Sequence, residues 1–361
     1  MSADAAATDE LLASLPPELP GAAAWYGPDM MRRTDWIVPL DPDDVADLEA
    51  AVAPLAASSA DIASLTRADF PLPTLGAKLE RVLREILDER GFVLLRGLPI
   101  ERMTRREAAI AFFGMGAHMG RARAQNAAGH LLGHVADLGL SSRDPHVRIY
   151  QTSERQTYHT DSCDVVGLLC LATARSGGLS TLVSSSTIFN EMRRRRPDLL
   201  ALLLQPIATD RRGEVPAGMR PWFDIPVFSW YEGHLTALYH RPYIDSAQRF
   251  PEVPRLTRQQ IAALDLFDDL TNDPALHLHM EFRPGDIQLV HNHTVLHDRT
   301  AFEDWPEPAR RRHLLRLWLA CPQARPLPPG FAERYGSVER GNRGGIVLPD
   351  TAPLSAPLEP V

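Results

Sequence analysis

The sequence predicts a mainly β protein with peripheral helices, whose core is a β-sandwich or jelly roll. Short apolar or β-branched runs bounded by polar, Gly or Pro residues are typical of strands, and they recur through the second half of the chain. Helical patterns are concentrated in the first half and in one segment between these strands. Many short strands with few helices favour two packed β-layers.

The first half carries most of the expected helices. Residues 43–53, 75–90 and 105–118 show helical patterns, and a proline on either side should bound the first of them. Residues 92–97 form an apolar run that ends in glycine, which predicts a buried strand followed by a turn.

The second half is richer in strand signals. A helix over residues 187–204 should separate two strands, with Ser186 or Thr187 as its N-cap and a break at Pro197. The Pro-Gly-Asp sequence at 284–286 predicts a turn before the next strand. The expected strands cover 165–171, 182–184, 287–290 and 314–320.

The composition is that of an ordinary globular protein, with 361 residues of which 44% are apolar. No linker, repeat or low-complexity break divides the chain, so we expect a single domain over residues 25–348. The segments 1–24 and 349–361 are rich in Ala and Pro and predict flexible termini.

Charge and cysteine content narrow the classes of partner. A net charge of −8 argues against a nucleic-acid partner, and the basic run 193–196 is interpreted as a solvated helix face. Three cysteines without a CxxC pair fit a reducing cytoplasm. No stretch approaches the ~18–20 apolar residues of a membrane-spanning helix, so we expect no membrane partner. A homo-oligomer is left open.

The first chemical motif is His159-Thr160-Asp161. On a strand, residues two apart point to the same face, so this imidazole and carboxylate can bind one metal ion. Alone, the motif is weak, because strand-end hydrogen bonding explains it as well. Asp164 would face the opposite side of the strand, and Cys163 is interpreted as a small core residue.

A second cluster holds His291, His293 and His297. One more imidazole would give two histidines and one carboxylate, a facial triad that leaves open positions on iron(II) for a bidentate co-substrate and dioxygen. Because this cluster lies far from Asp161 in the sequence, the fold rather than a local loop must assemble the site.

A third element is the arginine-rich run at 310–318. On a strand, Arg312 and Arg316 lie four apart on one face. Guanidinium groups bind carboxylates through paired, charge-assisted hydrogen bonds, which suits a dicarboxylate co-substrate. A basic edge strand is the alternative. The apolar continuation over 317–320 favours a buried strand, in which arginine needs an anionic partner.

Together these elements resemble the taurine dioxygenase and clavaminate synthase-like superfamily of iron(II)- and 2-oxoglutarate-dependent oxygenases. The resemblance extends from about Gly91 to Cys321. The family order of HxD, a Gly-Gly turn followed by Ser or Thr, an Asn-containing segment ending in His, and an RRxxxR strand is found here. It implies a double-stranded β-helix, which is a distorted jelly roll, with O2 and 2-oxoglutarate as co-substrates.

The resemblance also assigns residues. It implies that His159, Asp161 and His297 bind iron(II). Arg312 would bind the distal carboxylate of 2-oxoglutarate, with help from a hydroxyl of Ser180 or Thr181, and Arg316 would face the same pocket. The loop at 303–308 is longer than in some members, and the register against Arg316 selects Arg312 among its neighbours. Leu179 follows the Gly-Gly turn, where many relatives have an acidic residue.

The expected reaction is hydroxylation of an unactivated C–H bond of a small molecule, an amino acid or natural-product intermediate, with release of succinate and CO2. Desaturation, oxidative cyclisation, a non-catalytic jelly-roll binder and a zinc hydrolase are the alternatives. Asp161 argues against a halogenase, which needs that coordination position vacant. Residues near the motifs that are candidates for substrate contact are Gln125, Asn126, Tyr150, Arg155 and Tyr158.

Overall fold

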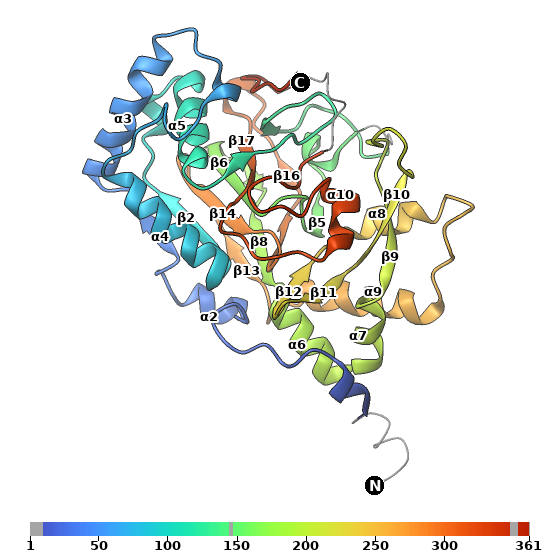
Figure 1. The fold of residues 1–361 in the computed structure, drawn as a ribbon. Helices are drawn as coiled ribbons and strands as arrows, with labels where there is room; N and C mark the ends of the chain where they lie inside the picture. The colour runs from blue at the N-terminus through green and yellow to red at the C-terminus, as the bar shows by residue number, and fades with distance from the viewer. Residues whose placement is uncertain (1–9, 144–146, 347–352, 361) are drawn as a thin grey trace.

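The computed structural model describes residues 10–143, 147–346 and 353–360 (Figure 1). The strands of the larger sheet are β1 (Ile37–Pro39), β2 (Phe92–Arg96), β3 (Arg121–Ala122), β4 (Leu132–Val135), β6 (Val165–Ala172), β14 (Ile287–His291) and β17 (His313–Ala320). They are arranged in the order β1-β2-β14-β6-β17-β3, with β4 also paired to β17. Only the β1–β2 pair in this sheet is parallel among the described strands.

A smaller antiparallel sheet faces the larger one. Its strands are β5 (Gln156–His159), β8 (Ser180–Ser184), β13 (Leu278–Met280) and β15 (Val295–Arg299), in the order β13-β8-β15-β5. Leu182 and Val295 of this sheet pack with Phe92, Val290 and Leu314 of the larger sheet in one apolar cluster. Two sheets stacked through such a layer form the jelly-roll core that the sequence predicted.

Helices cover the outer faces of both sheets (Figure 1). The larger sheet packs alternate side chains, such as Val93, Leu315 and Leu317, against α3 (Pro42–Ala56), α4 (Leu75–Asp88) and α5 (Arg105–Ala117). The smaller sheet packs Val183 and Leu296 against α6 (Ser185–Arg195), α7 (Pro197–Leu203) and α9 (Arg258–Thr271). Because strand side chains alternate, the intervening residues point into the space between the sheets.

Shorter elements complete the chain. They are α2 (Gly27–Met31), α8 (Arg241–Ala247), α10 (Ala332–Tyr335), β7 (Ser176–Gly177), β9 (Pro206–Asp210), β10 (Trp222–Pro226), β11 (Phe228–Tyr231), β12 (His234–Ala237) and β16 (Phe302–Glu303), with 3-10 turns at Ile62–Ser64, Ile100–Arg102, Ile149–Gln151, Pro308–Arg310 and Pro329–Phe331. No described helix has both the length and the apolar character needed to cross a membrane.

The predicted helices and strands are present, and two local details were wrong. The first helix does not end before Pro54 but continues to Ala56, because Leu55 and Ala56 still pack against the core and proline in the last turn removes only one helical hydrogen bond. The N-cap of α6 is Ser184, whose hydroxyl accepts a 3.0 Å hydrogen bond from the Thr187 amide. The break at Pro197 is confirmed.

The described parts of both termini contact the core. Leu15 is buried beside α6, and the Arg193 guanidinium donates to the carbonyls of Leu12 and Pro16. Arg193 is therefore not part of a solvated face. At the other end, the Ser355 carbonyl accepts a 2.7 Å hydrogen bond from the Leu131 amide.

Candidate active site

Three side chains that are separated in the sequence meet at β5 and β15. In this antiparallel pair His159 lies directly opposite His297, and such partners project to the same face of a sheet. Their ring centroids are 4.2 Å apart. The Asp161 carboxylate lies 3.9 Å from His159 Nε2 and 3.7 Å from His297 Nε2. One donor atom from each residue fits within 4.8 Å of the others, a geometry that suits one metal ion.

The strand argument for the His-x-Asp motif was wrong in one respect. β5 ends at His159, so Asp161 lies in the following loop and not on the strand. Asn292 holds this loop instead. Its side-chain oxygen accepts a 2.7 Å hydrogen bond from the Asp161 amide, and its side-chain nitrogen donates to the carbonyls of Asp161 and Cys163. The asparagine of the family pattern therefore positions the loop that carries Asp161.

His159 has the protonation state that a metal ligand needs. Its Nδ1 lies 2.8 Å from the Thr157 carbonyl and donates to it, which leaves Nε2 as the unprotonated nitrogen on the side of the Asp161 carboxylate. Burial and the neighbouring imidazole of His297 hold the pKa of His159 well below its usual range. The Gln156 side-chain amide lies 2.9 Å from Nε2 and caps this lone pair.

Asp161 is held as a carboxylate. Trp318 Nε1 donates a 2.8 Å hydrogen bond to it, and an Arg316 guanidinium nitrogen lies 3.8 Å away. Burial alone would raise the pKa of Asp161, but Arg316 and the imidazoles outweigh burial, and the pKa is below its ordinary value. Two imidazole nitrogens with an anionic oxygen form a donor set that iron(II) accepts.

The rival ligands belong to a different cluster. His293 Nε2 lies 3.0 Å from the Asp164 carboxylate, which also accepts hydrogen bonds from the Arg343 guanidinium. His291 contacts the Thr294 hydroxyl through Nδ1. The four titratable side chains of this cluster, His291, His293, Asp164 and Arg343, are fully buried. Asp164 pairs with His293 and Arg343 within this cluster. The candidate metal group therefore consists of His159, Asp161 and His297 and does not include these side chains.

A cavity between the two sheets adjoins the metal group. His159 and His297 line it from the smaller sheet, and Arg312 and Arg316 line it from the larger sheet. Arg312 directly precedes β17, which is an interior strand between β6 and the β3–β4 side and not an edge strand. Arg312, Leu314 and Arg316 point between the sheets, because Leu314 packs in the layer between them.

Two guanidinium groups in this cavity are buried and have no anionic partner among the residues that the structure describes. Arg312 is 4% exposed and Arg299 is 6% exposed. Within the described part of the chain, Nη1 of Arg312 and both Nε and Nη1 of Arg299 have no hydrogen-bond partner. Burial lowers the pKa of Arg312 to about 10 and that of Arg299 to about 9. Buried charge of this kind needs an anion, and a dicarboxylate fits.

Ser180 faces this cavity, whereas Thr181 does not. Ser180 Oγ lies 2.9 Å from the Gln288 side-chain nitrogen on the opposite sheet. Thr181 donates a 3.0 Å hydrogen bond to Asp298 on the outer face. The Gly-Gly turn before them has a structural role, because Gly178 has a φ of +68° and a Cβ there would lie 2.9 Å from Arg312 Nε.

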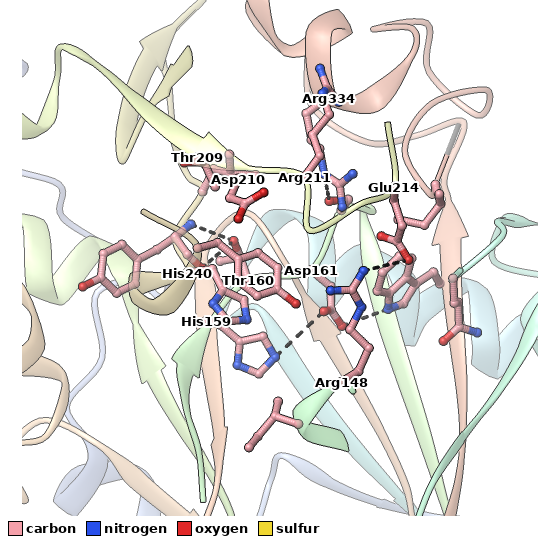
Figure 2. Close-up of a pocket in the computed structure, with 18 of the residues that line it drawn as sticks. Arg148, His159, Thr160, Asp161, Thr209, Asp210, Arg211, Glu214, His240 and Arg334 are labelled. Carbon is pink, nitrogen blue, oxygen red and sulfur yellow. Dashed lines mark hydrogen bonds and ion pairs between the residues drawn. The ribbon is translucent and has the colours of Figure 1, made fainter. Parts of the chain in front are cut away.

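A second cavity lies on the other side of the metal group (Figure 2). It shares Gln156, His159 and Arg316 with the first cavity. Its remaining lining comes mainly from three segments, at 148–150, 209–243 and the C-terminal region. Sequence reasoning missed its arginines, Arg148, Arg211 and Arg334, since they lie outside any motif and far apart in the sequence.

Of the five residues predicted to contact substrate, two line a cavity beside the metal group and three do not. Gln125 and Tyr150 line the second cavity, where Gln125 accepts a 2.6 Å hydrogen bond from Arg316 Nε and Tyr150 stacks on the same guanidinium. The other three side chains line neither cavity. Asn126 bonds within its own loop, Arg155 pairs with Asp298, and Tyr158 packs against His277.

Comparison with known proteins agrees with this geometry. Residues 51–318 match the family described as "Taurine catabolism dioxygenase TauD, TfdA family". The chain is 30% identical to FR-33289 synthase of Streptomyces rubellomurinus over 88% of this chain and 94% of that protein. It is 31% identical to a uridine-5'-phosphate dioxygenase of Amycolatopsis sp, over 48% of this chain and 65% of that protein.

A solved structure of similar fold is the non-heme iron oxygenase OrfP in complex with Fe and alpha-ketoglutaric acid. It aligns with a TM-score of 0.60 at 15% identity, over 78% of this chain and 93% of that chain. The family match, the relative aligned over most of its length and the site geometry agree. The chain therefore belongs to the TauD/TfdA dioxygenase family and is an iron(II)- and 2-oxoglutarate-dependent oxygenase.

Proposed function

We propose that His159, Asp161 and His297 bind iron(II) and that Arg312 binds the distal carboxylate of 2-oxoglutarate. The observation that carries this proposal is a buried guanidinium without an anionic partner, in the cavity that two of the metal ligands line. A paired, charge-assisted hydrogen bond to a carboxylate satisfies such a group. A zinc hydrolase would have no use for it.

The surrounding residues would orient the co-substrate and the metal. Arg299 contributes a second unpaired guanidinium, and Arg299 and Arg312 lie 4.9 and 5.1 Å from the ring of Phe302. Ser180 adds a hydroxyl on the same face. Arg316 and Trp318 keep Asp161 ionised and oriented, so the carboxylate presents a fixed oxygen to the metal.

We also propose that the reaction is hydroxylation of an unactivated C–H bond. When bound, iron(II) with 2-oxoglutarate and dioxygen supplies the oxidising power, and 2-oxoglutarate is converted to succinate and carbon dioxide. Burial of His159 and His297, beside an Asp161 side chain that is only 10% exposed, limits the access of bulk water to the reacting centre. The second cavity would hold the substrate, because it opens on the same ligands from the other side.

The substrate is a small molecule. The relatives support this class, since one is named for uridine-5'-phosphate. Three free, buried thiols support a reducing cytoplasm as the compartment.

The decisive experiment is anaerobic titration of the purified protein with iron(II) and 2-oxoglutarate, followed by succinate measurement after air is admitted. We expect one iron and one 2-oxoglutarate per chain, and oxygen-dependent succinate. His297→Ala should lose iron binding, whereas His293→Gln should keep one iron per chain. Retention of tight iron binding and succinate formation by His297→Ala would refute the ligand assignment.

A further inference from the structure

We infer that the second cavity binds a phosphate- or phosphonate-type anionic group of the substrate through Arg148, Arg211 and Arg334. This inference rests on the proposed function, since it concerns the substrate of the same centre. Figure 2 shows the three arginines around one cavity, with Arg211 and Arg334 on the opposite side from His159.

Arg334 offers free donors to the cavity. Its Nε donates a 2.8 Å hydrogen bond to the Ser162 hydroxyl, and its guanidinium lies 5.6 Å from the Phe223 ring. No salt bridge joins Arg334 to a carboxylate in the described part of the chain. Burial lowers the pKa of this guanidinium below its ordinary value, so an added anion would relieve an unfavourable charge.

Arg211 is also without a carboxylate partner among the described residues. It is buried, and its Nε and Nη2 donate to the carbonyls of Arg220 and Glu333 at 3.0 and 2.6 Å. Neutral carbonyls orient the guanidinium but do not cancel its charge. It lies 5.3 Å from the same Phe223 ring as Arg334, so two positive charges share one aromatic platform.

Arg148 approaches from a third segment. Nη2 donates to the Arg212 carbonyl and lies 3.2 Å from Glu214, while the buried Nη1 has no partner in the described structure. The free Nη1 of Arg148 can donate a hydrogen bond to one more acceptor. This unsatisfied donor points to a ligand in the cavity independently of the positive charge of the three arginines.

The carboxylates of the cavity do not neutralise this group. Asp210 pairs with Arg249 at 2.7 Å and accepts from the Ser246 hydroxyl. Asp161 belongs to the metal group and faces Arg316. Glu214 forms its ion pair with Arg148, so no described carboxylate forms a direct ion pair with Arg211 or Arg334. Glu333 and Glu214 act on these two guanidinium groups only at longer range.

The number and origin of the donors favour a tetrahedral dianion. A planar carboxylate is satisfied by one guanidinium fork, whereas a phosphate monoester or phosphonate has three terminal oxygens and a larger charge. Three guanidinium groups from separate segments can each meet one of these oxygens. Apolar and aromatic walls from Leu238 and from Tyr243, which stacks on His240 at 3.6 Å, would hold the organic part.

The test uses the protein loaded with iron(II) and 2-oxoglutarate without oxygen. Binding of ethyl phosphate, propylphosphonate and butyrate is measured by calorimetry, so that ester, phosphonate and carboxylate are distinguished. We expect the two phosphorus anions to bind more tightly than butyrate. Arg334→Gln and Arg211→Gln should each weaken them about tenfold or more, as for loss of a charge-assisted hydrogen bond.

Arg220→Gln is the matched control, because Arg220 neighbours the cluster but is half exposed and pairs with Glu333 and Asp224. It should bind the probes like the wild type, and Arg334→Lys should retain part of the affinity. Equal binding of butyrate, or no effect of the arginine changes, would overturn the anion assignment. Normal iron and 2-oxoglutarate loading with no binding of any anion would overturn this inference alone, whereas failed loading would count against the proposed function.

Discussion

Replacement of Arg312 by methionine separates function from stability. The Arg312 side chain is buried and has no anionic partner among the described residues, and burial lowers its pKa to about 10. Each pKa unit corresponds to about 1.4 kcal/mol, so burying this charge costs on the order of 3 kcal/mol in the ligand-free protein. Methionine fills similar space without charge. We therefore expect Arg312→Met to be as stable as the ligand-free wild type or up to about 3 kcal/mol more stable.

The same substitution should impair use of the co-substrate. A hydrogen bond to a charged group contributes about 1.5–3 kcal/mol, and a paired arginine–carboxylate contact contributes more than one. The KM for 2-oxoglutarate, measured by succinate formation, should rise at least about tenfold to a hundredfold. Added 2-oxoglutarate should then no longer stabilise the protein in a urea-unfolding experiment.

Arg311→Met is the matched control, because Arg311 is the adjacent residue and is exposed. It should leave both the KM and the urea midpoint unchanged. If Arg312→Met lowers stability by several kcal/mol while the KM stays at the wild-type value, the guanidinium has a structural partner and the assignment is refuted. If Arg311→Met raises the KM instead, the register of the strand is off by one.

Three further predictions concern the loop, the turn and the response to acid. Asn292→Ala should weaken iron binding in a metal titration, since the Asp161 loop loses its side-chain hydrogen bonds, while near-ultraviolet circular dichroism stays native; unchanged iron affinity would contradict this. Gly178→Ala should raise the KM for 2-oxoglutarate and lower the free energy of unfolding by about 1–2 kcal/mol, because φ is +68° and the Arg312 side chain lies against the glycine. Gly139→Ala is the control, because Gly139 has a similar φ of +72° but no described atom within 4 Å of the added Cβ, and it should leave the KM unchanged. Burial and the neighbouring His134 lower the pKa of His313 from 6.5 to about 3. Between these two pH values the unfolded chain binds one proton more than the folded chain, so the free energy of unfolding falls as the pH drops below about 6.5. In urea unfolding, the free energy of unfolding of His313→Gln should fall less steeply with decreasing pH, and a pH dependence identical to that of the wild type would contradict this.

Much of the candidate site could be predicted from the sequence, because the spacing of residues along a strand determines which side chains share a face. A side-chain period of two explains why Arg312 and Arg316 share a face and why Arg299, two residues after His297, lies beside it. The same alternation would have selected Ser180 over Thr181, since Leu182 packs between the sheets and Val183 packs outside them. The position of His159 opposite His297 could not be predicted in this way, because it depends on the pairing of β5 with β15. No local sequence pattern predicts which strands pair.

The sequence by itself determined the types and order of the candidate metal ligands, the arginine-rich strand, and a β core with helices outside. Such features depend on residue type and on spacing within one strand, which are local quantities. Only the tertiary structure decided that Asp161 lies in a loop held by Asn292. It alone brought Arg148, Arg211 and Arg334 to one cavity. The physical reason is that long-range packing, rather than periodicity, sets which distant side chains share a buried space and which charges are left there without a partner.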